Sequence, residues 1–343
     1  MLLPTIPLFD EAAAARALER QALLTKPSGA LGRLEGLSVT LAGMTGRLDW
    51  LPLRRAVVVC AGDHGVVAQG VSAYPQVVTE QMVLNFLAGG AAVNVLARQM
   101  GARVTVVDAG VNATFASQPD LVIGKIGCGT ADMTHGPAMT TEQAEASLRL
   151  GLEVAQRELA RGLDVLVVGE MGIGNTTAAS AIIAAITGQP PERVTGRGTG
   201  IADEQLAHKI AVVQRALDVN QPVGVDTLAK VGGFEIGAMA GLMLGVAAAR
   251  VPVVLDGLIS TAAALIAAQL RPDIRRFLLA GHMSVEPGHQ AALAWLGLEP
   301  LLDLGMRLGE GTGALLALPL LEAAMRTLQE MATFGGAGVS GPA

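Results

Sequence analysis

Short apolar runs that alternate with helical patterns are the feature that most constrains how this chain can fold. Five such runs, ending at or near Gly or Asp, span residues 56–61, 103–108, 164–169, 251–256 and 277–281. Strands that alternate with helices are typical of a parallel sheet, because each parallel connection crosses over the sheet, usually through a helix. We therefore predict an α/β fold with a mostly parallel sheet flanked by helices.

Two long helical patterns lie between these runs. In residues 142–160, Leu and Ala recur on one helix face, and residues 203–219 form a second helix for which Asp203 is the expected N-cap. The chain has 43 Gly but only six Phe, two Trp and one Tyr. Such a composition predicts a core in which helices and strands approach one another closely, rather than a core filled by aromatic rings.

One segment is long enough to be considered as a membrane span. Residues 251–270 have the necessary length, and residues 236–249 before them are nearly uncharged. Arg250 and Asp256 interrupt this stretch, however, and VPVVL followed by Asp-Gly and an Ala-rich run is typical of a buried strand and helix. We therefore expect a buried β-α unit and no membrane insertion.

Charge and cysteine content indicate the compartment and exclude some partners. The chain has 24 Lys and Arg against 30 Asp and Glu, for a net charge of −6, without a block of like charge. This disfavours binding to nucleic acid or to anionic lipid. Cys60 and Cys128 belong to no CxxC pair, so we expect buried free thiols, and residues 1–11 lack the basic start of a signal peptide. These features predict a cytoplasmic protein.

A glycine-rich turn follows the third apolar run. Residues 164–177 read DVLVVGEMGIGNTT and lead into an Ala-rich helix. The N–H groups at the start of that helix, with the hydroxyls of Thr176 and Thr177, suit a phosphate. The alternative is a tight turn that needs Gly172 and Gly174 only for its backbone angles. The spacing only approximates GxGxxG, so a dinucleotide site is weakly supported.

Two glutamates stand in glycine-rich loops. Glu170, in the turn just described, would repel a phosphate, so it is better suited to a cationic or N–H-bearing part of a ligand. Glu310 stands between Gly309 and Gly311, which would allow a ligand to approach its carboxylate closely. The alternative for Glu310 is a structural role at the start of the following helix.

Other polar residues follow the ends of predicted strands, where open α/β sheets bind ligands. Asp63 and His64 occur in AGDHGV at residues 61–66, and both are potential metal ligands. The other histidines show no HxH or HExxH spacing, so we expect no metal. Asp256 and Ser284 also end strands and could meet at the same rim, although either could simply form a turn.

The two ends of the chain differ from its middle. Residues 10–25, 34–44 and 312–332 show helical patterns without strands, and we expect them to pack together as a small helical domain. The last residues, GGAGVSGPA at 335–343, have no apolar periodicity and are expected to form a flexible tail.

Taken together, these segments resemble the nicotinate-nucleotide–dimethylbenzimidazole phosphoribosyltransferases, which make the lower-ligand nucleotide of cobalamin. The resemblance covers nearly the whole chain. It is carried by KPSGALGRLE (26–35), AGDHGV (61–66), YPQVVTEQM (74–82), GEMGIGNTT (169–177), KVGGFEIGAMAG (230–241), PVVLDG (252–257), GHMSVEPGH (281–289) and RLGEGTGA (307–314).

The resemblance implies an architecture and a set of partners. It implies a Rossmann-like catalytic domain, here residues 51–305, and a small helical domain built from residues 1–50 and 306–334. It also implies a homodimer that acts on small-molecule substrates, nicotinate mononucleotide and a benzimidazole base, and that needs no cofactor.

The resemblance also implies an activity and residue roles. The reaction is phosphoribosyl transfer from nicotinate mononucleotide to 5,6-dimethylbenzimidazole with inversion at ribose C1′, and Glu310 is the catalytic base, with Glu170 as the second catalytic glutamate. The residues implied to contact the nucleotide are Gly172, Gly174, Asn175, Thr176, Thr177, Lys209, Asp256 and Ser284.

The chain departs from the family in two segments, one of which lines the base pocket in the family. Tyr74 and Met82 stand where the family has Ser and Gln, and Ser28 and Ala30 stand where it has Pro and Ser. We therefore expect a base pocket of different shape. Two other classes of function remain open on the residues alone: an NAD-dependent oxidoreductase that uses the glycine-rich turn, and a non-catalytic nucleotide-binding module.

Overall fold

The computed structural model describes residues 2–340, and a parallel sheet lies at its centre. Within these residues the sheet has six strands in the order β3-β2-β1-β4-β5-β6, and all its pairings are parallel. Its strands are β1 (Arg55–Gly62), β2 (Ala102–Gly110), β3 (Leu121–Ile123), β4 (Val165–Met171), β5 (Val253–Leu255) and β6 (Leu278–Ala280). A separate parallel pair consists of β7 (His282–Ser284) and β8 (Leu302–Met306).

The order of the strands sets where a ligand can bind. The chain adds β2 and β3 on one side of β1 and then β4, β5 and β6 on the other, so the direction of winding reverses between β1 and β4. Open α/β sheets bind ligands at such a switch point, in the crevice beyond the carboxyl ends of the strands. Asp63 and Gly172 follow those two ends, so the glycine-rich turn begins at the expected crevice.

Helices connect the strands and cover both faces of the sheet. The helices up to β4 are α1 (Glu11–Leu23), α2 (Arg33–Thr45), α3 (Val78–Leu87), α4 (Ala92–Gln99) and α5 (Thr141–Ala160). After β4 come α6 (Asn175–Thr187), α7 (Pro191–Val194), α8 (Asp203–Asn220), α9 (Thr227–Val231), α10 (Phe234–Ala247), α11 (Leu258–Leu270), α12 (Pro287–Leu296), α13 (Thr312–Glu330) and α14 (Phe334–Ala337). Three 3₁₀ turns complete the described elements: η1 (Gly65–Gln69), η2 (Gly224–Asp226) and η3 (Pro272–Phe277).

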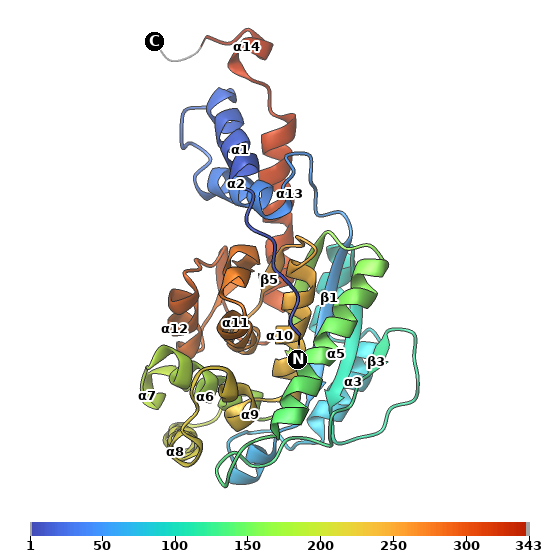
Figure 1. Ribbon diagram of the computed structural model, residues 1–343, viewed down its shortest axis with the longest axis vertical. Coiled ribbons are helices and arrows are strands. Elements are labelled where there is room, and N and C mark those ends of the chain that lie inside the picture. The colour runs from blue at the N-terminus through green and yellow to red at the C-terminus, as the bar shows by residue number, and fades with distance from the viewer. Residues whose placement is uncertain (1, 341–343) are drawn as a thin grey trace.

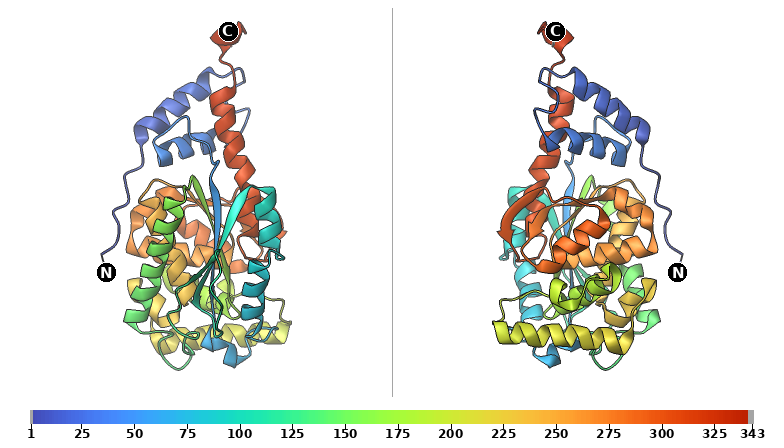
Figure 2. Two further views of the ribbon diagram at one scale, coloured as in Figure 1. Left: turned by 90° about the vertical axis from the view of Figure 1, so that its right-hand side faces the viewer. Right: turned by 90° about the vertical axis from the view of Figure 1, so that its left-hand side faces the viewer.

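Close helix packing forms one layer of the molecule. Figure 2 shows the strands nearly edge-on, with α5 in green on one side and the blue to teal helices α3 and α4 on the other. A Cβ on Gly151 of α5 would lie 2.0 Å from the Ala238 carbonyl oxygen of α10, and one on Gly241 would lie 2.0 Å from the Leu148 carbonyl oxygen. Larger residues would separate the two backbones, so glycine permits this contact, as the composition predicts.

Helices from both ends of the chain pack together away from the sheet. Figure 1 shows α1, α2 and the distal half of α13 above the strands, with α14 beyond them. The first part of α13 packs on β4 and β5, so this helix joins the sheet to the terminal helices. The expected tail at 335–343 begins within α14, and its residues 341–343 lie outside the described part of the chain.

The apolar stretch considered as a membrane span is part of the core. Residues 236–249 fall almost entirely in α10, where every residue except Gly245 is buried, and residues 251–270 contain β5 and α11. Within residues 2–340, no helix has both the length and the apolar character required to cross a bilayer.

The five apolar runs all become strands, which confirms the predicted α/β class, but β3, β7 and β8 were not predicted. These are short strands of three to five residues, too brief for a clear periodicity.

Two local predictions are wrong. Ala202, not Asp203, is the N-cap of α8, and the Asp203 side chain instead accepts a hydrogen bond from the Arg197 guanidinium. Cys60 is buried as expected, but Cys128 is exposed because it lies in the loop after β3.

Candidate active site

A cleft of about 710 Å³ lies beyond the carboxyl ends of β1 and β4. Most of the predicted site residues line it, which brings together segments far apart in the sequence. Those lining the cleft are Tyr74, Met82, Glu170, Gly172, Asn175, Thr176, Asp256, Ser284 and Glu310. Gly174, Thr177 and Lys209 are not among its lining residues.

A three-residue turn holds Glu310 in a left-handed backbone conformation. Gly309, Glu310 and Gly311 have φ angles of +87°, +63° and +93°. A non-glycine residue in this region costs about 1–2 kcal/mol of conformational energy, and glycine avoids the cost because it has no Cβ. The backbone of β4 lies against the turn, since a Cβ on Gly169 would be 2.2 Å from the Glu310 carbonyl oxygen. The turn therefore has little freedom to move, and the direction of the Glu310 side chain is set by its backbone.

The Glu310 carboxylate lies at the start of a helix, but not of the helix that follows it. The side chain is buried, and its Oε2 accepts a hydrogen bond of 3.1 Å from the backbone N–H of Val93, in the first turn of α4. Burial raises the pKa of Glu310, the Val93 N–H opposes that rise, and the negative charge of Asp256 adds to it. The structural role considered above thus exists, at α4 rather than at α13, and it engages only one of the two carboxylate oxygens.

Glu170 reaches the same cleft from the end of β4. The Asn175 side-chain amide donates to Glu170 Oε2, and the space beside Gly309 is filled by Glu170 Oε1. Burial, with the nearby charges of Asp256 and Glu235, raises the pKa of Glu170 to about 8. Glu170 is therefore mostly protonated at pH 7 and can donate a hydrogen bond, whereas a carboxylate there would repel Glu310.

For Glu170→Gln we expect the melting temperature, relative to that of the unchanged protein, to rise as the pH increases from about 5 to 8. Folding raises the Glu170 pKa from 4.5 to about 8, so its stabilising contribution is complete below 4.5 and is lost as the pH approaches 8. The amide introduced by Glu170→Gln does not titrate, so the variant does not lose stability in this way as the pH rises. Thermal unfolding at several pH values measures the difference, and Glu153→Gln on an exposed position of α5 is the control. A constant difference would contradict a protonated Glu170.

The start of α6 is less open to a phosphate than its sequence suggests. Gly174 has a φ of +95°, so the turn requires glycine there. The backbone N–H of Ile173 donates to Thr79 Oγ1 at 3.1 Å, and those of Asn175 and Thr177 donate to carbonyls within the turn. These three N–H groups are already engaged, which favours the tight-turn interpretation for this part of the motif. Thr177 is fully buried, and Thr176 faces the cleft.

Lys209 lies behind the cleft wall rather than in it. The side chain is buried, and its Nζ donates to Thr176 Oγ1 at 2.8 Å and to the Gly196 carbonyl at 3.2 Å. Burial lowers the Lys209 pKa to about 8, while the negative charge of Glu286 opposes that change. The ammonium group therefore polarises the Thr176 hydroxyl, which is the group that reaches the cleft.

A second glycine-rich loop, residues 196–200 (GRGTG), lines the cleft and was not predicted from the sequence. Gly198 N–H donates to Glu286 Oε1 at 2.9 Å, and Arg307 donates to the Gly198 carbonyl at 3.0 Å. The alternating glycines of GRGTG were the available signal, but the segment follows no apolar run. Only the fold places it opposite α6 and beside Arg307.

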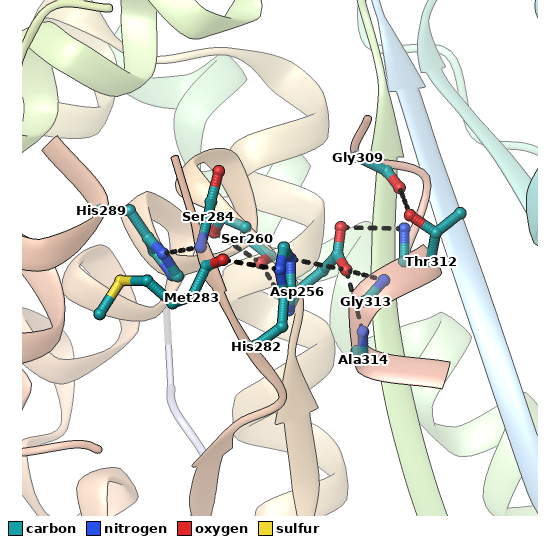
Figure 3. A network of polar contacts seen from close by, with 12 residues as sticks. Asp256, Ser260, His282, Met283, Ser284, His289, Gly309, Thr312, Gly313 and Ala314 are labelled. Carbon is teal, nitrogen blue, oxygen red and sulfur yellow. Dashed lines mark hydrogen bonds and ion pairs between the residues drawn. The ribbon is translucent and has the colours of Figure 1, made fainter. Parts of the chain in front are cut away.

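Asp256 and Ser284 lie together at the rim, as predicted, and Figure 3 shows the polar network around them. The Asp256 carboxylate accepts hydrogen bonds from backbone N–H groups at the start of α13. The Ser284 N–H donates to His289 Nδ1 at 2.9 Å, so the proton of His289 is on Nε2, which faces Thr261 Oγ1 at 3.1 Å. Burial and nearby His282 lower the His289 pKa to about 4, so His289 is neutral at pH 7.

Part of the cleft lining is apolar. Tyr74, just before α3, and Val78 and Met82 within it are spaced four residues apart and line the cleft. Leu258, Ile259, Met306 and Leu308 also line the cleft. Tyr74 is 53% exposed and stands at the mouth. An uncharged, flat ring would fit such a surface better than a charged group.

Asp63 and His64 lie near the crevice but are engaged elsewhere. Asp63 Oδ2 accepts from the Asn112 N–H at 2.8 Å, and His64 Nε2 lies 2.7 Å from Glu235 Oε1. Both carboxylates and the imidazole are buried. Across the part of the chain that the structure describes, no group of three or more His, Cys, Asp or Glu side chains is arranged to hold a metal ion.

Comparisons with known proteins agree along nearly the whole chain. A family model described as a phosphoribosyltransferase, DBI_PRT, matches residues 6–339. The nicotinate-nucleotide–dimethylbenzimidazole phosphoribosyltransferase of Roseiflexus sp. strain RS-1 is 59% identical over 97% of this chain and 95% of its own. The protein of that name from Desulforudis audaxviator is 55% identical over the same shares. The crystal structure of the enzyme of that name from Thermus thermophilus superposes with a TM-score of 0.93 at 50% identity, covering 97% of this chain and all of the other.

Proposed function

The chain belongs to the nicotinate-nucleotide–dimethylbenzimidazole phosphoribosyltransferase family, and from this membership we propose its substrates and mechanism. It transfers the phosphoribosyl group of nicotinate mononucleotide to 5,6-dimethylbenzimidazole, giving α-ribazole 5′-phosphate and nicotinate for the lower ligand of cobalamin. The observation that carries this proposal is a buried Glu310 carboxylate, fixed by its backbone, in a cleft with an apolar wall.

In the proposed reaction one imidazole nitrogen of the base attacks ribose C1′ while the bond from C1′ to the pyridinium nitrogen breaks. The bonding electrons go to that nitrogen, so nicotinate leaves with a neutral ring nitrogen. The attacking ring gains positive charge, which makes its other N–H acidic, and Glu310 accepts that proton. Attack on the face opposite the leaving group inverts C1′. A glutamate in this role can serve without an extreme pKa, because placement contributes most of its effect.

We place the two substrates at opposite ends of the cleft. The benzimidazole lies against Tyr74, Val78 and Met82, where its methyl groups meet apolar side chains, and its N–H faces Glu310. The donor lies toward Thr176 and Ser284, with its phosphate close to the hydroxyl that Lys209 polarises. A protonated Glu170 between them donates a hydrogen bond to the donor without repelling it.

For Lys209→Met we expect the KM of nicotinate mononucleotide to rise about 10-fold or more, because a hydrogen bond assisted by charge is lost near the phosphate. The KM of the base should change little. Steady-state kinetics with each substrate varied in turn measures both constants. Lys230→Met, which breaks a partly exposed ion pair with Asp226 instead, is the control. An unchanged KM for the donor would mean that Lys209 does not contribute to donor binding.

The proposal includes the organisation of the protein. We propose a catalytic domain of residues 51–305, a helical domain of residues 1–50 and 306–334, and a homodimer that works in the cytoplasm. Support for the domain division comes from the packing of α1 and α2 on α13. Light scattering on the purified protein determines the oligomeric state.

The function is tested by incubating the purified protein with nicotinate mononucleotide and 5,6-dimethylbenzimidazole, followed by chromatography with mass detection. We expect nicotinate and a ribazole phosphate in equal amounts. Nicotinate without the second product would indicate hydrolysis, and saturable binding without consumption would indicate a binding module. Either result would contradict the proposal.

A further inference from the structure

Asp256 makes its contacts with the backbone of another element. The residue follows β5 and is 2% exposed. Its Oδ1 accepts from the N–H groups of Gly313 and Ala314 at 2.7 and 3.0 Å, and its Oδ2 accepts from that of Gly311 at 3.2 Å. Asp256 therefore satisfies the unpaired N–H groups at the start of α13, a helix whose own N-cap residue, Gly311, has no side chain to do so.

These bonds act on the turn that carries Glu310. Gly311 is the residue directly after Glu310, and its N–H is held by Asp256. On the other side of Glu310, the Gly309 carbonyl accepts a 2.8 Å hydrogen bond from Thr312 Oγ1. Figure 3 shows the contact between Gly309 and Thr312, and those of Gly313 and Ala314 with Asp256, at the start of α13. Together, the hydrogen bonds of the Gly311 N–H and the Gly309 carbonyl hold the turn on both sides of Glu310, whose side chain faces the cleft.

We propose that Asp256 is a positioning residue, which holds the Glu310 turn in its left-handed conformation through the start of α13 rather than by contact with substrate. The proposal rests on the proposed function for its kinetic consequence. A role in binding the donor phosphate is poorly suited to Asp256, because two negative groups repel each other and the carboxylate already accepts three hydrogen bonds.

Removal of the Asp256 charge also changes the electrostatics of the cleft. Among the groups near Asp256 are Glu310, Glu170 from β4, His282 from β7 at 3.4 Å from Asp256 Oδ1, and His289 from α12. Glu235 from α10 acts on Glu170, and Glu286 and Arg307 also line the cleft. The Asp256 charge raises the pKa of both Glu310 and Glu170. A neutral side chain at this position should therefore lower both values.

The test is Asp256→Asn. The amide has one accepting oxygen and presents N–H groups to the helix start, so the turn shifts. We expect kcat to fall about 10- to 100-fold, because small displacements of a catalytic group have effects of that order. The KM of nicotinate mononucleotide should stay within about threefold, and the acidic limb of the pH profile should move to lower pH. Amide hydrogen exchange of residues 309–314 should become faster.

The control is Asp10→Asn, because Asp10 caps α1, far from the cleft, with a 2.8 Å bond from the Ala13 N–H. We expect no change in kcat for that variant. Thr312→Val, which removes the second bond to the turn, should resemble Asp256→Asn, while Thr312→Ser should retain activity. This pair provides the test if Asp256→Asn does not fold.

Three results would overturn the positioning role. One is a donor KM raised 10-fold or more at unchanged kcat, which would place Asp256 on the substrate. Another is an unchanged kcat with an unchanged pH profile. The third is unchanged hydrogen exchange at residues 309–314. Hydrogen exchange can be measured without activity. If the unchanged protein makes no product, the proposed function is wrong, but the exchange of residues 309–314 in the variants still tests the positioning role.

Discussion

Glu310→Gln should lower kcat by on the order of 10²-fold or more, the loss typical of removing a general base. The amide has nearly the shape of the carboxylate and can still accept the Val93 N–H bond through its oxygen, so the turn should keep its conformation. It cannot accept a proton from the attacking base. The KM of each substrate should therefore change much less than kcat. Steady-state kinetics together with the melting temperature separates these effects.

Glu153→Gln serves as the control for this substitution, since Glu153 is exposed on α5. That variant should keep the kcat of the unchanged protein. If Glu310→Gln retained turnover within a few-fold, Glu310 would not be the base, and the protonated Glu170 beside it would be the next group to test.

The second large effect is expected for Gly169→Ala, a change of one methyl group on β4. An added Cβ would lie 2.2 Å from the Glu310 carbonyl oxygen and 3.0 Å from the Gly311 nitrogen, so the backbone of the turn must move away. A displacement of about 1 Å in a catalytic group can cost on the order of 10²-fold in rate. We therefore expect kcat to fall by about that factor, measured with both substrates saturating.

Gly136→Ala is the matched control for that variant. A Cβ at Gly136 meets no atom within 4 Å, and the backbone of this residue lies outside the left-handed region. We expect its kinetic constants to match those of the unchanged protein. Full activity of Gly169→Ala would mean that the turn tolerates displacement, which would contradict the view that backbone placement of Glu310 is essential.

The fold class and the presence of the two glutamates in glycine-rich loops beside a ligand cleft could be predicted from the sequence, for physical reasons that are local. β1 and β4 are buried on both faces, so their residues form continuous apolar runs. Gly309 and Gly311 beside Glu310 predict a loop in which a ligand can reach the carboxylate, and the structure adds that all three residues have positive φ. Alternation of strands and helices then places the loops after β1 and β4 at one edge, where the cleft lies.

Contacts between distant segments could not be predicted in this way. The bond from Val93 to Glu310 joins residues 217 positions apart, and the bonds from α13 to Asp256 span more than 50. No local pattern at Asp256 distinguishes a helix cap from a ligand contact. The pKa of Glu170 likewise depends on burial and on Asp256 and Glu235, which only the fold brings close.

The proposed mechanism is tested most directly by the configuration of the product at C1′. The reaction of nicotinate mononucleotide with 5,6-dimethylbenzimidazole would be run to completion, and the ribosyl H1′ signals and their nuclear Overhauser contacts recorded by NMR. Nicotinate mononucleotide is the β anomer, so a displacement from the face opposite the leaving group, with Glu310 as base, predicts the α anomer alone. A β anomer, or a mixture of the two, would contradict a single inverting displacement.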